Sequence, residues 1–249
     1  MLVGLLLGLR IGDPRLWLIA VVMLSAQFSI SALNDWADAG LDAAAGRPRP
    51  IPRGLVSRQS AMIAAVVFGV LAVAGLLAAG PGGAGILLVA IGLTSGWLYD
   101  LVLKSTPWSF LPFAVAFPLL AVWVGVVAGR PLMALLPFFT IGAPLGVAIH
   151  LADSMSDLDS DAASGLGSLA VRLGRGRSTA LMQGTLLLAS LLVVKSFVYQ
   201  LPFAILLGVT SLVGAGLAGK TVTEHPGRTR WIVTATALAG AIPWLALHR

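Results

Sequence analysis

The feature that most constrains this chain is a succession of apolar runs, each close to the 17 to 25 residues that a helix needs to cross a bilayer. Eight runs meet this description: Pro14–Leu33, Ser57–Ala79, Ala84–Tyr99, Ser109–Ala128, Pro131–His150, Thr179–Val198, Leu201–Gly219 and Trp231–Leu247. A ninth run, Leu2–Leu9, is too short to cross alone, so we expect it to be a short or truncated first helix. Residues 1–249 are therefore expected to form one transmembrane domain.

Composition excludes a soluble fold. Hydrophobic residues make up 58% of the chain and charged residues only 10%, whereas soluble domains carry about 25% charged residues. So few charges cannot cover a water-exposed surface. The absence of cysteine excludes disulfides and thiolate chemistry. We therefore predict an all-α integral membrane protein with about nine transmembrane helices.

Positive charge alternates between the loops. Counting Leu2–Leu9 as the first segment, the loops after the even-numbered segments hold most of the sixteen lysines and arginines, namely Arg47, Arg49, Arg53, Arg58, Lys104, Arg172, Arg175, Arg177, Lys220, Arg228 and Arg230. The loops on a membrane's cytoplasmic side carry such an excess. These loops are therefore predicted to be cytoplasmic, in a bacterial or archaeal cell membrane.

Most acidic residues gather in two places on that same side. Seven of the ten are Asp35, Asp38 and Asp42, and Asp153, Asp157, Asp159 and Asp161. On helices, the first three would share an arc of roughly 60°, and Asp153, Asp157 and Asp161 an arc of about 80°. We call these two triads the first and second aspartate groups. Asp159 points away from its neighbours.

These acids have two explanations. Solvated loop carboxylates account well for Asp159. We expect Asp100 to be solvated too, with a local substrate or metal contact as its alternative. Solvation accounts poorly for two groups of three aspartates that each share one helix face. Carboxylates placed so close together repel one another unless cations neutralise them. Mg²⁺ suits such an all-oxygen set, since it binds through a few carboxylates and adds substrate phosphates. The two groups are thus predicted to face each other and hold Mg²⁺ and a diphosphate.

Cations follow each aspartate group. Arg47, Arg49 and Arg53 come after the first group, and Arg172, Arg175 and Arg177 after the second. Lys104 lies just past an apolar run, close to Tyr99. Phosphate oxygens that metals leave free need such donors. The charge bias of cytoplasmic loops explains Arg58, Arg175 and Arg177 equally well, whereas Lys104 is the better candidate for a phosphate contact.

Three motifs resemble the signatures of the UbiA superfamily of intramembrane prenyltransferases. Asn34-Asp35-x-x-Asp38-x-x-x-Asp42 with the following RPRPIPRG is similar to its first motif, and Asp153-x-x-x-Asp157-x-x-x-Asp161 with AVRLG to its second. LYDLVLKSTPWS, which holds Tyr99 and Lys104, is similar to a third. The motifs occur in the family's order and cover nearly the whole chain.

The resemblance implies nine transmembrane helices around a central cavity with cytoplasmic capping loops. It also implies Mg²⁺-dependent transfer of a prenyl group from a prenyl diphosphate to a lipophilic, possibly aromatic acceptor, with membrane lipid and no nucleic acid as partners. By position, one Mg²⁺ would be held by Asn34, Asp35, Asp38 and Asp42, and another by Asp153, Asp157 and Asp161. The diphosphate would contact Lys104, Tyr99 and some of Arg47, Arg49 and Arg53.

The carbocation formed in such a reaction needs a dry, aromatic chamber. Candidate linings are Trp97, Trp108, Phe110, Phe113, Phe117 and Trp123. Aromatic residues facing lipid or the membrane interface are the alternative, and Trp108 fits the interface well.

Other functions remain open at this point. A cation transporter explains intramembrane acids but not the cations beside them. A phosphatidyl-transferase would need a continuous acid, arginine and glycine motif that this sequence lacks. A UbiA-type terpene cyclase is compatible with intact aspartate groups. No stretch distinguishes among the acceptors that family members use, which include quinone-ring acids, haem, chlorophyllide, glycerophosphate lipids and phosphoribosyl diphosphate.

Overall fold

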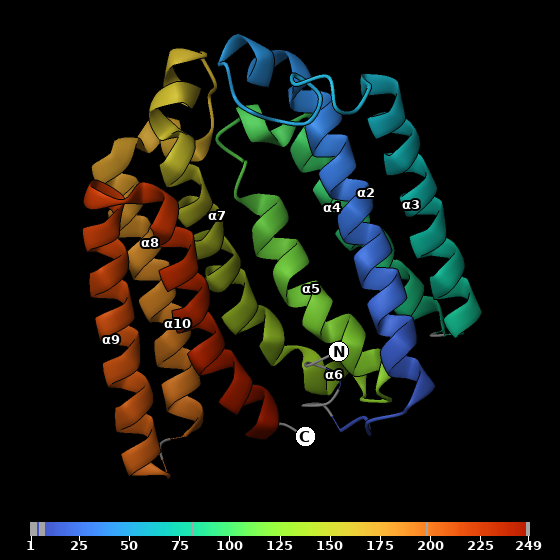
Figure 1. Ribbon diagram of the computed structural model, residues 1–249. Coiled ribbons are helices and arrows are strands. Elements are labelled where there is room, and N and C mark those ends of the chain that lie inside the picture. The colour runs from blue at the N-terminus through green and yellow to red at the C-terminus, as the bar shows by residue number, and fades with distance from the viewer. Residues whose placement is uncertain (1–3, 5–7, 81, 198, 248–249) are drawn as a thin grey trace.

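In a computed structural model of the protein, the described residues are 4, 8–80, 82–197 and 199–247, and within them the chain is helical, with no strand (Figure 1). Eight long helices are α2 (Pro14–Ala44), α3 (Arg58–Ala79), α4 (Gly82–Leu101), α5 (Leu111–Val127), α7 (Pro137–Ala163), α8 (Leu169–Ser196), α9 (Leu201–Glu224) and α10 (Pro226–Leu247). Two short helical turns, η1 (Leu103–Ser105) and α6 (Leu132–Leu135), lie in connections.

Six helical segments in the described part of the chain are long and apolar enough to cross a membrane, which confirms an integral membrane protein. They are α2, α3, α4, α8, α9 and the stretch of α6 and α7, whereas α5 is apolar but shorter. The predicted count of about nine transmembrane helices is not confirmed. Residues 1–3 and 5–7, most of the Leu2–Leu9 run, lie outside the described residues.

Helix starts follow capping signals in the sequence. The Asp13 side chain accepts a hydrogen bond from the Arg15 N–H at the start of α2, and Pro14 occupies the first turn, where its missing N–H costs nothing. Ser57 caps α3 in the same way by accepting from the Ser60 N–H. These caps fix where α2 and α3 begin.

Helices α2 and α7 continue beyond the apolar runs that predicted them. The first run ends at Leu33, but α2 extends to Ala44; the fifth run ends at His150, but α7 extends to Ala163. Each extension adds more than two helical turns, roughly 16 to 20 Å at 1.5 Å per residue. The aspartate groups therefore lie on rigid helix ends rather than in loops.

The halves of the bundle meet where α5 crosses α7. Figure 1 shows α2 to α5 on one side and α7 to α10 on the other. At Gly146, an added Cβ would lie 2.2 Å from the carbonyl oxygen of Phe113, and at Gly142 it would lie 2.8 Å from Cβ of Pro118. Only a residue without a side chain allows α5 to approach α7 this closely.

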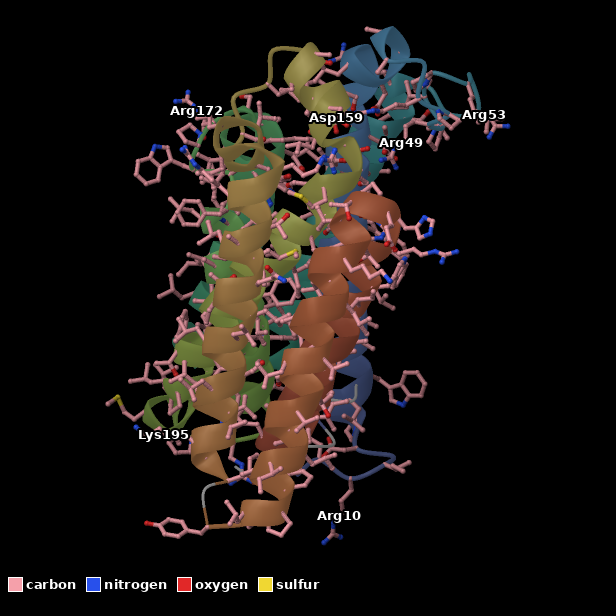
Figure 2. All side chains as sticks on the ribbon, turned by 90° about the vertical axis from the view of Figure 1, so that its left-hand side faces the viewer. Arg10, Arg49, Arg53, Asp159, Arg172 and Lys195 are labelled. Carbon is pink, nitrogen blue, oxygen red and sulfur yellow. The ribbon has the colours of Figure 1, made fainter. Side chains whose placement is uncertain are left out.

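Charged side chains gather at the two ends of the bundle. Figure 2 labels Arg49, Arg53, Asp159 and Arg172 at the end that holds the tips of α2 and α7, and Arg10 and Lys195 at the opposite end. The middle of the helices carries apolar side chains, as expected for the part that contacts lipid. The carboxyl-terminal ends of α2 and α7 share one end of the molecule (Figure 1).

Candidate active site

A polar cavity of about 630 Å³ lies between the ends of α2, α4 and α7. We call it the aspartate cavity. The carboxylates that line it are Asp35, Asp38, Asp100, Asp153, Asp157 and Asp161. Members of both predicted aspartate groups, more than a hundred positions apart in sequence, thus share one cavity.

Basic and neutral donors complete the lining. The cations are Arg47, Arg49, Lys104 and Arg230, and the neutral polar side chains include Asn34 and Tyr99. Six carboxylates against four cations leave an excess of negative charge in the cavity. Such an excess favours binding of additional cations.

Two cations form three ion pairs with these carboxylates in the described part of the chain. Lys104, on η1, pairs with Asp38 of α2. Arg47, just past α2, reaches Asp42 Oδ1 with Nη1 at 3.3 Å and Asp161 Oδ1 with Nη2 at 2.9 Å. The hydrogen bond to Asp161 raises the pKa of Arg47 above its usual value. Arg47 therefore ties the end of α2 to the end of α7.

Two predicted site residues lie outside the cavity lining. Asp42 is only 3% exposed and faces its partner Arg47. The helical stripe groups it with Asp35 and Asp38, but in the last turn of α2 its side chain is buried against Arg47 and does not line the cavity. Arg53 does not line the cavity either, and Figure 2 shows it at the outer edge of the same end. Asp159 behaves as predicted, because its exposed side chain pairs with Arg175 at 2.8 Å.

Asp100 was expected to be solvated, and this was wrong. It is 7% exposed, lines the cavity and accepts a hydrogen bond of 3.0 Å from Asn34 Nδ2 on its Oδ1. Its Oδ2 has no hydrogen-bond partner among the described residues. Burial follows from the position of Asp100 in the last turn of α4, which packs beside α2. The signal that would have found it is its place one turn before Lys104.

Arg230 is a cavity residue that the sequence interpretation assigned only to the charge bias. It lies near the start of α10, at the boundary of the last apolar run, and faces the second aspartate group. No local motif marks it, since α10 reaches the cavity only through the folding of the second half.

Aromatic rings form the apolar floor beneath the carboxylates. Tyr99 contacts Phe113 edge to face with ring centroids 5.1 Å apart, and His150 lies 4.7 Å from Phe113. His150 is 1% exposed, and its Nε2 lies 3.0 Å from Ser109 Oγ. The floor is therefore a packed cluster of side chains from α4, α5 and α7.

The lining suits Mg²⁺ in its chemistry. Every carboxylate and the Asn34 amide offer the hard oxygen ligands that this ion prefers. Among the described residues, however, no three His, Asp or Glu side chains lie close enough together to hold a metal by themselves. The two predicted sites, each with three carboxylates around one Mg²⁺, are therefore not preformed by these side chains. Mg²⁺ usually takes one or two carboxylates and completes its shell with water and substrate phosphates.

Comparison with known proteins identifies the family. The model of the UbiA prenyltransferase family matches residues 1–234. The chain belongs to the UbiA prenyltransferase family. The sequence resemblance is thereby confirmed over most of the chain.

Individual relatives agree with this UbiA assignment. A digeranylgeranylglyceryl phosphate synthase of Methanoregula boonei is 36% identical over 170 residues, which cover 67% of this chain and 59% of that protein's length. A UbiA homologue from Aeropyrum pernix K1 superposes with a TM-score of 0.76 at 17% identity, covering 96% of this chain and 91% of that one. One from Archaeoglobus fulgidus, bound to DMAPP and Mg²⁺, gives 0.69 at 15% identity, covering 97% and 92%. The likeness to the two solved structures establishes the shared fold.

Proposed function

We propose that this protein transfers a prenyl group from a prenyl diphosphate to a lipophilic acceptor within the membrane, with Mg²⁺ as its cofactor. The observation that carries the proposal is the convergence of carboxylates from α2, α4 and α7 on one cavity that also holds basic side chains. The structural relative solved with DMAPP and Mg²⁺ supports it. The charge pattern of the loops favours a cavity that opens to the cytoplasm.

The residues of the cavity have separable roles in this reaction. Asp35, Asp153 and Asp157 would hold Mg²⁺, which supplies positive charge to the departing diphosphate. Asp38, which pairs with Lys104, would hold that lysine at the cavity. Lys104 and Arg49 would donate to the phosphate oxygens, as charge-assisted donors do. The metal-binding carboxylates would act mainly on the charge that develops as the carbon–oxygen bond breaks. Lys104 and Arg49 would already contact the phosphates of the bound donor and so would strengthen its binding as well.

The floor of Tyr99 and Phe113 would protect the cationic fragment. Both rings line the aspartate cavity. Their faces stabilise positive charge, and their bulk keeps water from the allylic carbon. A new bond then forms between that carbon and the acceptor nucleophile, which loses its proton.

A glyceryl phosphate lipid is the acceptor that we favour. The relative from Methanoregula boonei is named for a digeranylgeranylglyceryl phosphate product, which implies a prenylated glyceryl phosphate as acceptor and a geranylgeranyl donor. An acceptor phosphate would find a basic partner in Arg230 at the cavity lining. An aromatic acceptor is the competing possibility within the family.

The experiment uses the purified full chain in lipid nanodiscs. Geranylgeranyl diphosphate, Mg²⁺ and either geranylgeranylglyceryl phosphate or 4-hydroxybenzoate are supplied, and diphosphate release and prenylated product are measured together. Product with the glyceryl phosphate supports the proposal. Diphosphate release with a hydrocarbon product and no acceptor dependence would establish a cyclase instead. Failure to release diphosphate from any prenyl donor would contradict the prenyltransferase assignment and leave the transporter hypothesis.

A further inference from the structure

Asp100 is a carboxylate of the aspartate cavity to which the proposed reaction assigns no role. It lies in the last turn of α4 and is 7% exposed, and its Oδ1 accepts the hydrogen bond of 3.0 Å from Asn34 Nδ2. Its Oδ2 has no hydrogen-bond partner among the described residues. Burying a carboxylate with an unpaired oxygen costs free energy. The chain therefore places here a group that stability alone disfavours.

Asp100 and Asn34 meet because α2 and α4 approach closely one helical turn before each of them. A Cβ added at Gly96 would lie 2.4 Å from Ile30 Cδ1, so only glycine fits at this crossing. Asn34 follows Ile30 by four residues and Asp100 follows Gly96 by four, and residues four apart share a helix face. The crossing therefore brings the two polar side chains together.

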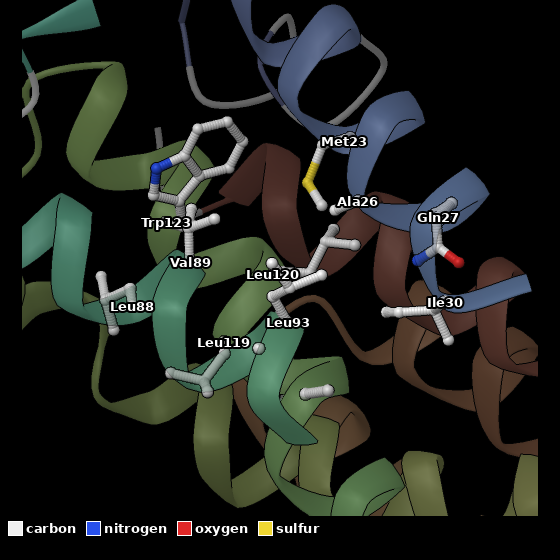
Figure 3. Close-up of a pocket in the computed structure, with 12 residues that line it drawn as sticks. Met23, Ala26, Gln27, Ile30, Leu88, Val89, Leu93, Leu119, Leu120 and Trp123 are labelled. Carbon is white, nitrogen blue, oxygen red and sulfur yellow. The ribbon is translucent and has the colours of Figure 1, made fainter. Parts of the chain in front are cut away.

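The pair lies where the space between these helices changes from apolar to polar. Ile30 lines both the aspartate cavity and an apolar cavity of about 70 Å³ among α2, α4 and α5. Figure 3 shows this apolar cavity with Ile30 at one side and Trp123 at the other. Asn34 and Asp100 line the aspartate cavity but not the apolar one. Their hydrogen bond is thus at the polar side of that boundary.

The carboxylate determines which end of the Asn34 amide faces it. A carboxylate only accepts hydrogen bonds, whereas an amide carries an NH₂ donor at one end and a carbonyl acceptor at the other. The NH₂ group must therefore turn toward Asp100, and the carbonyl oxygen must turn away. Asn34 is half-buried, and its Oδ1 accepts no hydrogen bond from the described residues. This oxygen is left available to a ligand in the aspartate cavity.

Resting on the proposed function, we propose that Asp100 is a positioning residue, which holds the carbonyl oxygen of Asn34 toward the Mg²⁺ that the neighbouring Asp35 would bind. Mg²⁺ takes oxygen ligands, and the NH₂ end of an amide offers it none. An outer residue that orients a metal ligand in this way typically contributes a factor of about 10 to 100 in metal affinity. The amide of Asn34 is therefore a ligand whose usefulness depends on Asp100.

A purely structural tie between α2 and α4 is the alternative, and the chain offers a matched control for it. Trp97 Nε1 on α4 donates to Ser29 Oγ on α2 at 3.2 Å, so the two helices share a second side-chain hydrogen bond. Ser29 is 0% exposed, also donates to the Ala65 carbonyl oxygen, and does not line the aspartate cavity. Ser29→Ala thus breaks a bond between α2 and α4 away from the metal-binding groups.

The test measures metal binding by the full chain in nanodiscs, with Mn²⁺ as the probe because it suits the same oxygen ligands. The inert analogue dimethylallyl S-thiolodiphosphate is present at a saturating concentration, and free Mn²⁺ is measured by electron paramagnetic resonance against nanodiscs without protein. Asp100→Leu removes the acceptor, and we expect the dissociation constant for Mn²⁺ to rise about tenfold or more. Asp100→Asn keeps a carbonyl acceptor, so the rise should be smaller, about threefold. Ser29→Ala should leave the constant unchanged.

A double-mutant cycle tests whether Asp100 acts through Asn34. Asn34→Ala removes the amide and should itself raise the dissociation constant about tenfold or more. Adding Asp100→Leu to Asn34→Ala should then change the constant less than about twofold, because no amide remains to be oriented. If the two losses instead multiply, Asp100 binds the metal itself or acts through its charge, and the positioning role is overturned.

The outcomes separate this inference from the proposed function. If the wild-type protein binds no Mn²⁺ with the analogue, the proposed function fails and the positioning role fails with it. If the wild type binds Mn²⁺ but folded Asp100→Leu binds it equally well, or Ser29→Ala weakens binding as much as Asp100→Leu does, only the positioning role is overturned. If Asp100→Leu does not fold, the weaker binding of Asp100→Asn, and the disappearance of that effect in the Asn34→Ala background, decide the question.

Discussion

The two aspartate groups meet in one cavity, but their charges are compensated differently. In the first group, on α2, Asp38 pairs with Lys104 and Asp42 with Arg47. In the second group, on α7, only Asp161 has an ion pair, and its partner Arg47 comes from the end of α2. Among the described residues, Asp153 and Asp157 make no salt bridge. Most of the uncompensated charge therefore lies on the α7 side.

From this difference we infer two roles: the paired carboxylates hold the helices together, and the unpaired carboxylates are available for binding. Pairs that already hold a cation keep α2, η1 and the end of α7 in place before any substrate arrives. In the proposed reaction, the carboxylates without an ion pair would bind the metal ions that accompany a diphosphate. The uncompensated set is Asp35 from the first group and Asp153 and Asp157 from the second. Substituting members of the two sets should thus have unequal effects.

The largest expected effect is loss of an uncompensated carboxylate. We expect Asp153→Asn and Asp35→Asn each to lower Mg²⁺-dependent diphosphate release by about a thousandfold, because the interaction is made with charge that develops in the transition state. The amide keeps the shape of the side chain, so the unfolding temperature should change little. Asp159→Asn, outside the cavity, is the control. Full activity of Asp35→Asn at saturating Mg²⁺ would refute the assignment.

A smaller effect is expected for the cation that pairs with Asp38. Lys104→Ala should raise KM for the prenyl diphosphate about tenfold to a hundredfold, the range for a lost hydrogen bond to a charged group. Lys104→Arg should recover part of that loss, because the charge is retained. Steady-state kinetics with varied donor provide the measurement. A pure fall in kcat with unchanged KM would mean that Lys104 acts only on the departing diphosphate.

Asp42→Asn should affect stability more than catalysis. Asp42 is buried, faces Arg47 and does not line the cavity. Removing its charge weakens the pair, and we expect the free energy of unfolding to fall by about 1–3 kcal/mol while kcat/KM changes less than about tenfold. Denaturant unfolding in detergent and donor kinetics are compared with Asp35→Asn. Equal losses of kcat in the two variants at equal stability would remove the distinction between the two sets.

The sequence predicted the types of residue that line the cavity better than it predicted which individual residues reach it. The stripes of Asp35 and Asp38, and of Asp153 and Asp157, were readable because helical periodicity places such residues on one face. Periodicity does not show which helical turns of such a stripe reach the cavity. The sequence therefore predicted that Asp42 belongs to the same site as Asp35 and Asp38. Its position depends on where α2 ends relative to α7, which tertiary packing determines.

Asp100 and Arg230 illustrate the same limit, because both line the cavity although the sequence did not predict this. Each lies at the end of an apolar run, where a charged residue is normally solvated. Their burial in the cavity arises because α4 packs beside α2 and α10 against α7. The sequence likewise did not determine that α5 and α7 approach closely at Gly146, because a glycine in a membrane helix is equally consistent with helix bending and with close helix packing. Only contacts between distant segments resolve such alternatives.

The smallest expected effect distinguishes two arginines of one loop. Arg49 lines the aspartate cavity and Arg53 does not, although RPRPIPRG presents both equally in sequence. We expect Arg49→Ala to raise KM for the donor about threefold to tenfold, as loss of one long, partly solvated donor does, and Arg53→Ala to leave it unchanged. The comparison is informative because the two variants remove the same side chain and the same charge from one loop. If Arg53→Ala raised KM as much as Arg49→Ala, the loop would act through its overall charge, and the position of Arg49 at the cavity would carry no special role.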